Sequence, residues 1–181
     1  KKPPASKLST GRNITLLGNI TIKNIYPEVD FRGGMNVRGA TILGKGEKES
    51  IASLIFHREN KPSIIARSTS FLFRDNTISS AMCSITLYVD NDSITHSAIE
   101  LDYASQSREM WLMRGKDGPM RMPFINTYHN IDMYSEALHW KLKEENIEFC
   151  AIPGPTSSTQ ASFESINYFT AERMNKFMGF N

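Results

Sequence analysis

The stretch Met82–Gly118 decides the fold, and it reads MCSITLYVDNDSITHSAIELDYASQSREMWLMRGKDG. In Cys83–Val89 every odd position is apolar, and the even positions carry Ser, Thr and Tyr. The alternation resumes in Ala98–Tyr103 and again in Glu109–Arg114. Short clusters of Asp, Asn, Ser and Gly lie between and after these runs. Period-two alternation between turn-forming clusters indicates half-buried antiparallel strands, so the stretch predicts a three-stranded β-meander.

The residues before this stretch show the same alternation. Further strands are expected over residues 14–23, 37–43, 51–57 and 64–73. Pro27 should end or bend the first of them, because proline has no N–H to donate to a strand ladder. The chain is therefore expected to be mainly β, most simply an antiparallel meander or sandwich.

The residues after Pro119 differ in pattern. In Ile131–Asn146, apolar residues at Tyr134, Ala137, Leu138 and Leu142 fall at helical spacing. This spacing predicts a helix there. We also expect strands over 147–152 and 163–169 and a short helix over 170–178. The predicted organisation is a linker or disordered start (1–12), an antiparallel β domain (13–124) and a small α/β appendage (125–181) packed on it.

Composition narrows the classes of function. The chain has 181 residues and a net charge of +2 with scattered Lys and Arg, which disfavours a nucleic-acid partner. No apolar run approaches the roughly 20 residues that cross a bilayer, so membrane insertion is not expected. Because the sequence begins at Lys1 rather than Met, we expect a fragment or a processed product.

Motifs for metals, cofactors and nucleophilic catalysis are not found. The chain has no G-x-S-x-G elbow and no phosphate-loop frame. Cys83 and Cys150 lie in apolar runs and are expected to be small buried hydrophobic residues. None of the histidines has the spacing of a metal-ligand motif: His57, His96, His129 and His139. No cofactor and no metal are therefore expected.

Aromatic residues on polar strand faces are the strongest sign of function. Tyr88 shares its face with Ser84 and Thr86, and Trp111 shares one with Glu109. An exposed aromatic ring suits stacking on a sugar or on a protein surface. The alternative is that both faces are covered, as in a sandwich or an oligomer. The candidate receptor-binding residues are Tyr88, Arg108, Trp111, Tyr128, His129 and Trp140.

A carboxylate pair offers an alternative with catalysis. Glu100 and Asp102 point to one strand face about 7 Å apart. Two carboxylates that reach one glycosidic bond are what a glycoside hydrolase needs. Exposed acidic residues are far more often simply solvated, so we expect no enzymatic activity.

Three segments of the first half resemble the distal region of bacteriophage tail fibres. Leu16–Ile22 has the pattern Gly-Asn-hydrophobic-Thr-hydrophobic, Pro27–Gly33 contains Pro-x-hydrophobic-Asp-Phe, and Ala52–Phe56 is an alternating strand. The resemblance implies a homotrimeric, β-structured fibre tip in the virion, made in the host cytoplasm. Its partner would be a bacterial surface glycan or an outer-membrane protein.

Part of the tail-fibre pattern is missing. Many such fibres end in a self-cleaving chaperone domain that opens with a Ser-Asp dipeptide, and this sequence has no such dipeptide. Protease activity is therefore not expected. Two other functions stay open, a tailspike-like polysaccharide hydrolase and a structural or assembly protein of the virion.

Apolar residues on both faces of several strands favour an oligomer. Leu17 lies opposite Leu16, Ile55 opposite Phe56 and Met113 opposite Leu112. A monomer that exposed these second faces would carry a large apolar patch. The pattern predicts more than one copy, and the resemblance to tail fibres implies three.

Overall fold

The computed structural model of the protein describes residues 14–38, 41–46, 51–151 and 161–165. All strand pairs in this part are antiparallel, which confirms the prediction of a mainly β fold. The predicted linker 1–12 and the helix at 170–178 lie outside the described residues. The elements are β1 Ile14–Tyr26, β2 Val29–Arg38, β3 Thr41–Lys45, β4 Ala52–Arg58, β5 Lys61–Ser68, β6 Ser70–Arg74, β7 Thr77–Val89, β8 Asp92–Ala104, β9 Glu109–Met113, a 3-10 turn η1 Gly118–Arg121, β10 Phe124–Asn126, β11 Ile131–Tyr134, β12 Ala137–Lys141, β13 Ile147–Cys150 and β14 Ser162–Ser165.

Six of the strands form a closed ring. The pairing runs β7–β5–β4–β2–β3–β6 and returns to β7, because β6 also pairs with β7. Outside the ring, β8, β9, β12 and β13 continue the sheet from β7 in that order, which confirms the predicted β7–β8–β9 meander. Closure removes the free edges that these six strands would otherwise present to solvent.

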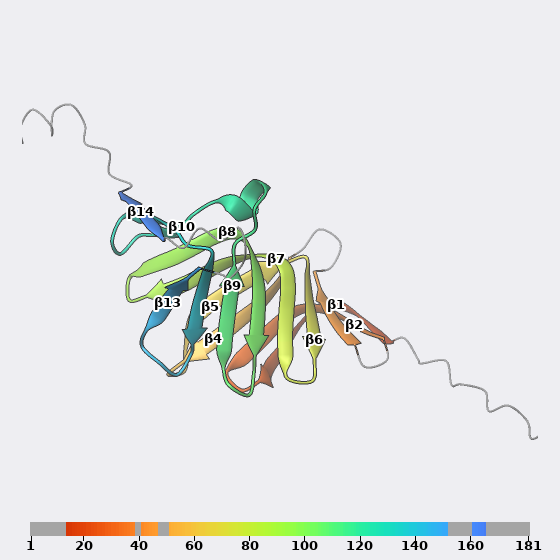
Figure 1. Cartoon of the computed structure of the whole chain (residues 1–181). Helices are drawn as coiled ribbons and strands as arrows, with labels where there is room; N and C mark the ends of the chain where they lie inside the picture. The colour runs from red at the N-terminus through yellow and green to blue at the C-terminus, as the bar shows by residue number, and fades with distance from the viewer. Residues whose placement is uncertain (1–13, 39–40, 47–50, 152–160, 166–181) are drawn as a thin grey trace, which may run out of the picture.

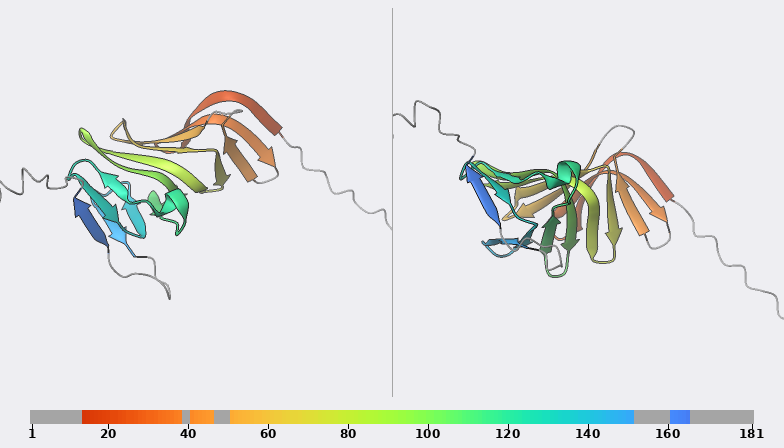
Figure 2. Two further views of the ribbon diagram at one scale, coloured as in Figure 1. Left: turned by 90° about the horizontal axis from the view of Figure 1, so that it is seen from above. Right: turned by 45° about the horizontal axis from the view of Figure 1, so that its top comes forward.

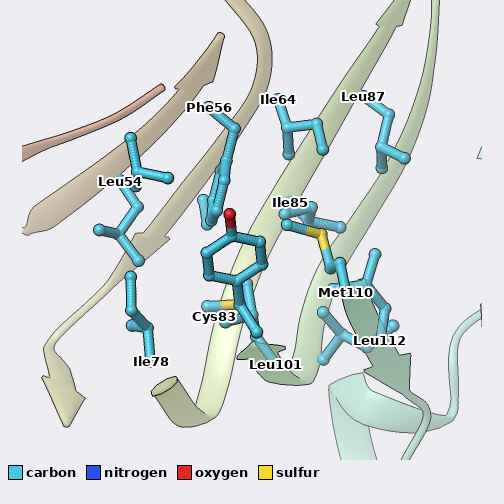
Figure 3. Close-up of a cluster of buried hydrophobic side chains, with 14 of the residues drawn as sticks. Leu54, Phe56, Ile64, Ile78, Cys83, Ile85, Leu87, Leu101, Met110 and Leu112 are labelled. Atoms are coloured by element: carbon cyan, nitrogen blue, oxygen red, sulfur yellow. The ribbon is translucent and has the colours of Figure 1, made fainter. Parts of the chain in front are cut away.

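The ring is flattened into two layers (Figures 1 and 2). We call the layer with β4, β5 and the second half of β7 the β5 layer. The layer with β6, β9 and the second half of β8 is the β9 layer. Their inner faces form one apolar core (Figure 3), in which the Phe56 and Tyr103 rings meet edge to face at 5.0 Å.

Strand β7 takes part in both layers. Thr77–Ser79 lies in register between β6 and β8, whereas Ser84–Leu87 pairs with β5. The inward residues are even-numbered up to Ser80 and odd-numbered from Cys83, and Ala81 and Met82 between them are both exposed. This β-bulge lets one strand keep a buried face while it passes from one layer to the other.

Strand β2 also changes its pairing partner along its length, and it does so at Gly33. Residues before it pair with β4 and residues after it pair with β3. Its φ of 151° favours glycine, and a Cβ there would lie 2.8 Å from the Lys45 carbonyl oxygen and 2.9 Å from the Phe31 ring. Only a residue without a side chain fits this position.

A sharp corner at Thr69 separates β5 from β6, so the prediction of one strand over 64–73 was wrong. Buried hydroxyl groups hold this corner against the β7 bulge. The Ser80 hydroxyl donates to the Ser68 hydroxyl at 2.9 Å, and the Ser68 hydroxyl lies 2.8 Å from the Met82 carbonyl oxygen. Both hydroxyls also lie within hydrogen-bond distance of the Ser70 carbonyl oxygen.

The predicted helix over Ile131–Asn146 was also wrong, because this segment forms β11, β12 and the turn that leads to β13. Its apolar residues fall at helical spacing because a turn joins two short strands. The Ser135 hydroxyl in this turn bonds the carbonyl oxygens of Ala137 and Cys150, at 2.8 and 2.9 Å. Strand β12 pairs with β9 along its whole length, and the edge of β9 needs such a partner.

We expect Ser80→Ala to lower the free energy of unfolding by about 1–3 kcal/mol, since it leaves buried polar groups of the corner unpaired. Urea denaturation measures the change. Ser79→Ala, which removes a hydroxyl from the adjacent outward-facing residue, is the matched control and should change stability by no more than about 0.5 kcal/mol. Equal losses in the two variants would contradict a special role for the buried pair.

His96 lies buried in β8 and holds the segment that follows β9. Its Nε2–H donates to the Met122 carbonyl oxygen at 2.7 Å, while its Nδ1 accepts the Ala98 N–H at 3.1 Å. This arrangement uses the neutral ring. Burial lowers the pKa of His96; the bond to Met122 opposes that shift, and the charge of Arg114 adds to it.

The lowered pKa of His96 predicts a pH-dependent stability. The unfolded side chain takes up a proton near pH 6.5, about its ordinary value, and the folded one only at lower pH. The contribution of His96 to the free energy of unfolding is therefore complete above about pH 6.5. It is lost as the pH falls toward the pKa of His96 in the folded protein. Urea midpoints measured through this range should fall less steeply in His96→Gln than in the parent protein.

Exposed His129 supplies the control for this experiment, and His129→Gln should keep the parental pH dependence. If His96→Gln also keeps the parental pH dependence of the urea midpoint, the His96 imidazole is not the source of that dependence.

Candidate functional site

One row of side chains crosses the outer surface of the β9 layer. Asp102 of β8 lies opposite Trp111 of β9, Trp111 opposite His139 of β12, and His139 opposite Glu148 of β13. The residues that flank them along each strand are mostly buried, so this row points away from the core. We call the surface formed by these four residues and Glu109 the Trp111 face.

The Trp111 indole stacks on the His139 imidazole. The ring centroids are 4.2 Å apart and the planes differ by 18°. His139 is itself fixed, because its Nδ1 lies 3.0 Å from a Glu148 carboxylate oxygen and its Nε2 lies 4.0 Å from one of Glu109. Since His139 covers one side of the indole and 39% of Trp111 is exposed, the other side is open to a ligand.

The open side of the indole faces Asp102 and, one strand further, Ser79 of β7. A flat ring stacked there would lie above a carboxylate and a hydroxyl. A sugar ring has one apolar side for the indole and hydroxyl groups that donate to such oxygens. The geometry therefore suits a polyhydroxylated ring.

The surface around Trp111 is acidic. Asp102, Glu109 and Glu148 surround the stack, while the nearby Lys141 ammonium lies 3.5 Å from Glu144. Partial burial raises the pKa of Asp102. These carboxylates favour hydroxyl donors or cations over anionic groups.

Glu100 and Asp102, the proposed hydrolytic pair, are both exposed on the outer face of β8. Asp102 adjoins Trp111 in the sheet, and Glu100 adjoins Met113. The two carboxylates therefore share the face that carries the aromatic ring. The expectation that the protein has no enzymatic activity remains a prediction.

Tyr88 lies on the opposite layer from Trp111. It is 45% exposed on the outer face of the β5 layer, and its strand partner is Ser93. The Ser93 carbonyl oxygen accepts the Thr127 N–H at 3.0 Å, which brings the loop with Tyr128 and His129 to the same end of the layer. Tyr88 and this loop therefore belong to a second surface.

The two remaining candidates have structural roles. Arg108 lies in the turn between β8 and β9, and its guanidinium bonds the Glu28 carboxylate at 2.7 Å across to the β1–β2 turn. Trp140 is 4% exposed, and its indole N–H donates to the Glu144 carbonyl oxygen at 3.0 Å. Trp140 is a core residue and does not fit the predicted receptor contact.

His139, Glu109 and Glu148 were missed as site residues by sequence reasoning. The predicted helix over Ile131–Asn146 hid the alternation that puts His139 outside and Trp140 inside. A period of two over residues 137–141 would have placed His139 on the outer face. It would not have shown that β12 pairs with β9 and so brings His139 beside Trp111.

Both cysteines are free thiols. Cys83 is buried as predicted, and desolvation raises its pKa to about 12, which keeps it protonated and unreactive. Cys150 is half-buried, and its pKa is also raised, mainly by burial. Neither has the character of a catalytic nucleophile.

Among the residues that the structure describes, no group of three or more His, Cys, Asp or Glu side chains is arranged to hold a metal ion. In the same part of the chain, no helix has the length and apolar character needed to cross a membrane.

Comparison with protein-family models, with curated proteins and with solved structures found no match.

Proposed function

We propose that the protein is a non-catalytic attachment module that binds a bacterial surface glycan through the Trp111 face. The observation that carries this proposal is the open side of the Trp111 indole, held by its stack on His139 and facing Asp102. The resemblance of residues 14–60 to tail-fibre sequences supports a place at the tip of a phage tail fibre. The alternative partner of such a tip is an outer-membrane protein.

The proposed binding uses a surface that folding has already arranged. The imidazole of His139 supports the indole from behind, and Glu148 fixes the imidazole, so little side-chain freedom is lost when a ligand binds. A sugar ring would displace water from the indole and donate hydroxyl hydrogens to Asp102 and Ser79.

Trp111→Ala should weaken binding to an array of bacterial surface polysaccharides by about 1–3 kcal/mol, as expected when a central aromatic contact is lost. The melting temperature should hardly change, because the ring lies outside the core. The control is Met82→Ala, which removes an exposed apolar side chain at the β7 bulge, outside the Trp111 face, and should leave binding intact.

Tyr88→Ala tests the other surface in the same assay. Binding that survives loss of Trp111 but fails on loss of Tyr88 would contradict the Trp111 face and assign the contact to the β5 layer. A collapse of the melting temperature in Trp111→Ala would instead make the indole a structural residue.

We further propose that the module works as a homotrimer. Support comes from large apolar side chains on the surface of the described residues, among them Met122, Ile125 and Phe163, each more than 40% exposed. Association around a symmetry axis covers such residues without propagating a filament. Of the apolar residues on second faces, Met113 is half-buried, whereas Ile55 is already buried, with 9% of its surface exposed.

Light scattering at low micromolar concentration should therefore give three times the chain mass of 20.5 kDa. A single-chain mass across this concentration range would contradict the trimer and weaken the tail-fibre interpretation. The glycan-binding test does not depend on this result.

A further inference from the structure

A second row of polar side chains crosses the outer surface of the β5 layer, on the other side of the core from Trp111. Arg32 of β2 lies opposite Ser53 of β4, Ser53 opposite Arg67 of β5, and Arg67 opposite Ser84 of β7. The adjacent residues along each strand are buried, so all four point outward: Phe31, Leu54, Ala66 and Ile85 mark the inner positions.

The spacing places the two arginines on either side of one serine. Neighbouring strands lie about 4.8 Å apart, so the Cα atoms of Arg32 and Arg67 are separated by about 10 Å. Arginine side chains are long enough to lean inward across this gap. Both guanidinium groups can then meet above the Ser53 hydroxyl.

The charge of this pair is not neutralised. Within the part of the chain that the structure describes, neither guanidinium forms a salt bridge. The acidic residue nearest in sequence on this face is Asp30, and its carboxylate already accepts the Asn24 N–H at 2.9 Å and contacts His57 at 3.1 Å. Both arginines are exposed, so two cationic side chains face solvent on this layer.

We propose that Arg32 and Arg67 form a binding site for a phosphate ester, seated above Ser53. The planar guanidinium presents paired N–H donors that match two phosphate oxygens, and two such groups can hold a single phosphate from both sides. The Ser53 hydroxyl supplies a donor from below.

Exposed apolar side chains adjoin this site. Ile51 and Met82 precede Ser53 and Ser84 by two residues, which puts them near the row, and they are 57% and 54% exposed. The organic group esterified to the phosphate can therefore pack against the side chains of Ile51 and Met82. A phosphorylated sugar and a phospholipid headgroup both offer this chemistry.

Titration of the purified protein with glucose 6-phosphate, with glucose as the uncharged comparison, tests the site. Amide resonances of residues 32, 53 and 67 should shift with the phosphate and not with glucose. Arg32→Gln and Arg67→Gln should each weaken the phosphate interaction about tenfold, the loss expected for one charge-assisted contact. Arg67→Lys should weaken it as well, because lysine lacks the paired donors.

Arg74→Gln is the matched control, since Arg74 is also exposed but lies at the end of β6 on the β9 layer. It should leave the phosphate affinity unchanged, and so should Trp111→Ala. The result is therefore independent of the proposed glycan contact. An equal loss in Arg74→Gln, or no saturable shift with glucose 6-phosphate, would overturn the proposal.

Vesicles of phosphatidylcholine with and without phosphatidylglycerol identify the source of the phosphate. Sedimentation with the anionic vesicles that fails in the Arg32→Gln, Arg67→Gln double variant would assign the site to lipid headgroups. Response to glucose 6-phosphate without vesicle binding would assign it to soluble or glycan-borne phosphate. Vesicle binding that the double variant retains, without any response to glucose 6-phosphate, would overturn the site.

Discussion

The passage of long strands between two layers is the constraint on which this structure depends. Strand β7 must bury one face in each layer, and it does so only because its bulge at Ala81 and Met82 shifts the inward positions by one residue. The bulge leaves the Met82 carbonyl oxygen in the interior, where the Ser68 hydroxyl lies 2.8 Å from it and the Ser80 hydroxyl 3.2 Å from it. Buried polar groups thus fix the register in a core that is otherwise apolar.

In the described part of the chain, the inner faces of the ring strands fill the core, so the outer faces and edges are the surfaces left for a ligand. The two layers turn their outer faces in different directions and give them different chemistry. The β9 layer shows an indole among carboxylates, and the β5 layer shows two arginines that form no salt bridge with any described residue, near serine hydroxyls. The charges of the two faces therefore favour ligands of opposite sign.

Sequence reasoning worked best where one strand follows the next along the chain. The meander of β7, β8 and β9 follows from alternation and turn clusters, since hairpins pair neighbours in sequence. It failed at Ile131–Asn146, where apolar residues of two short strands imitate the spacing of a helix. It also missed the corner at Thr69, because apolar residues on both sides of the polar residues 67–70 suggest one strand, although β5 and β6 belong to different layers.

The sequence by itself determined that the chain is mainly β and that Trp111 stands on the polar face of its strand, because alternation is a local property of the backbone. Only the tertiary structure decided which strands became neighbours. The pairing of β9 with β12 puts His139 behind Trp111 and turns Trp140 into the core. The pairing of β2, β4 and β5 brings Arg32 and Arg67 together. Each of these pairings joins residues that lie far apart in the chain. A local sequence pattern can show that a strand forms, but it does not show which other strand will pair with it.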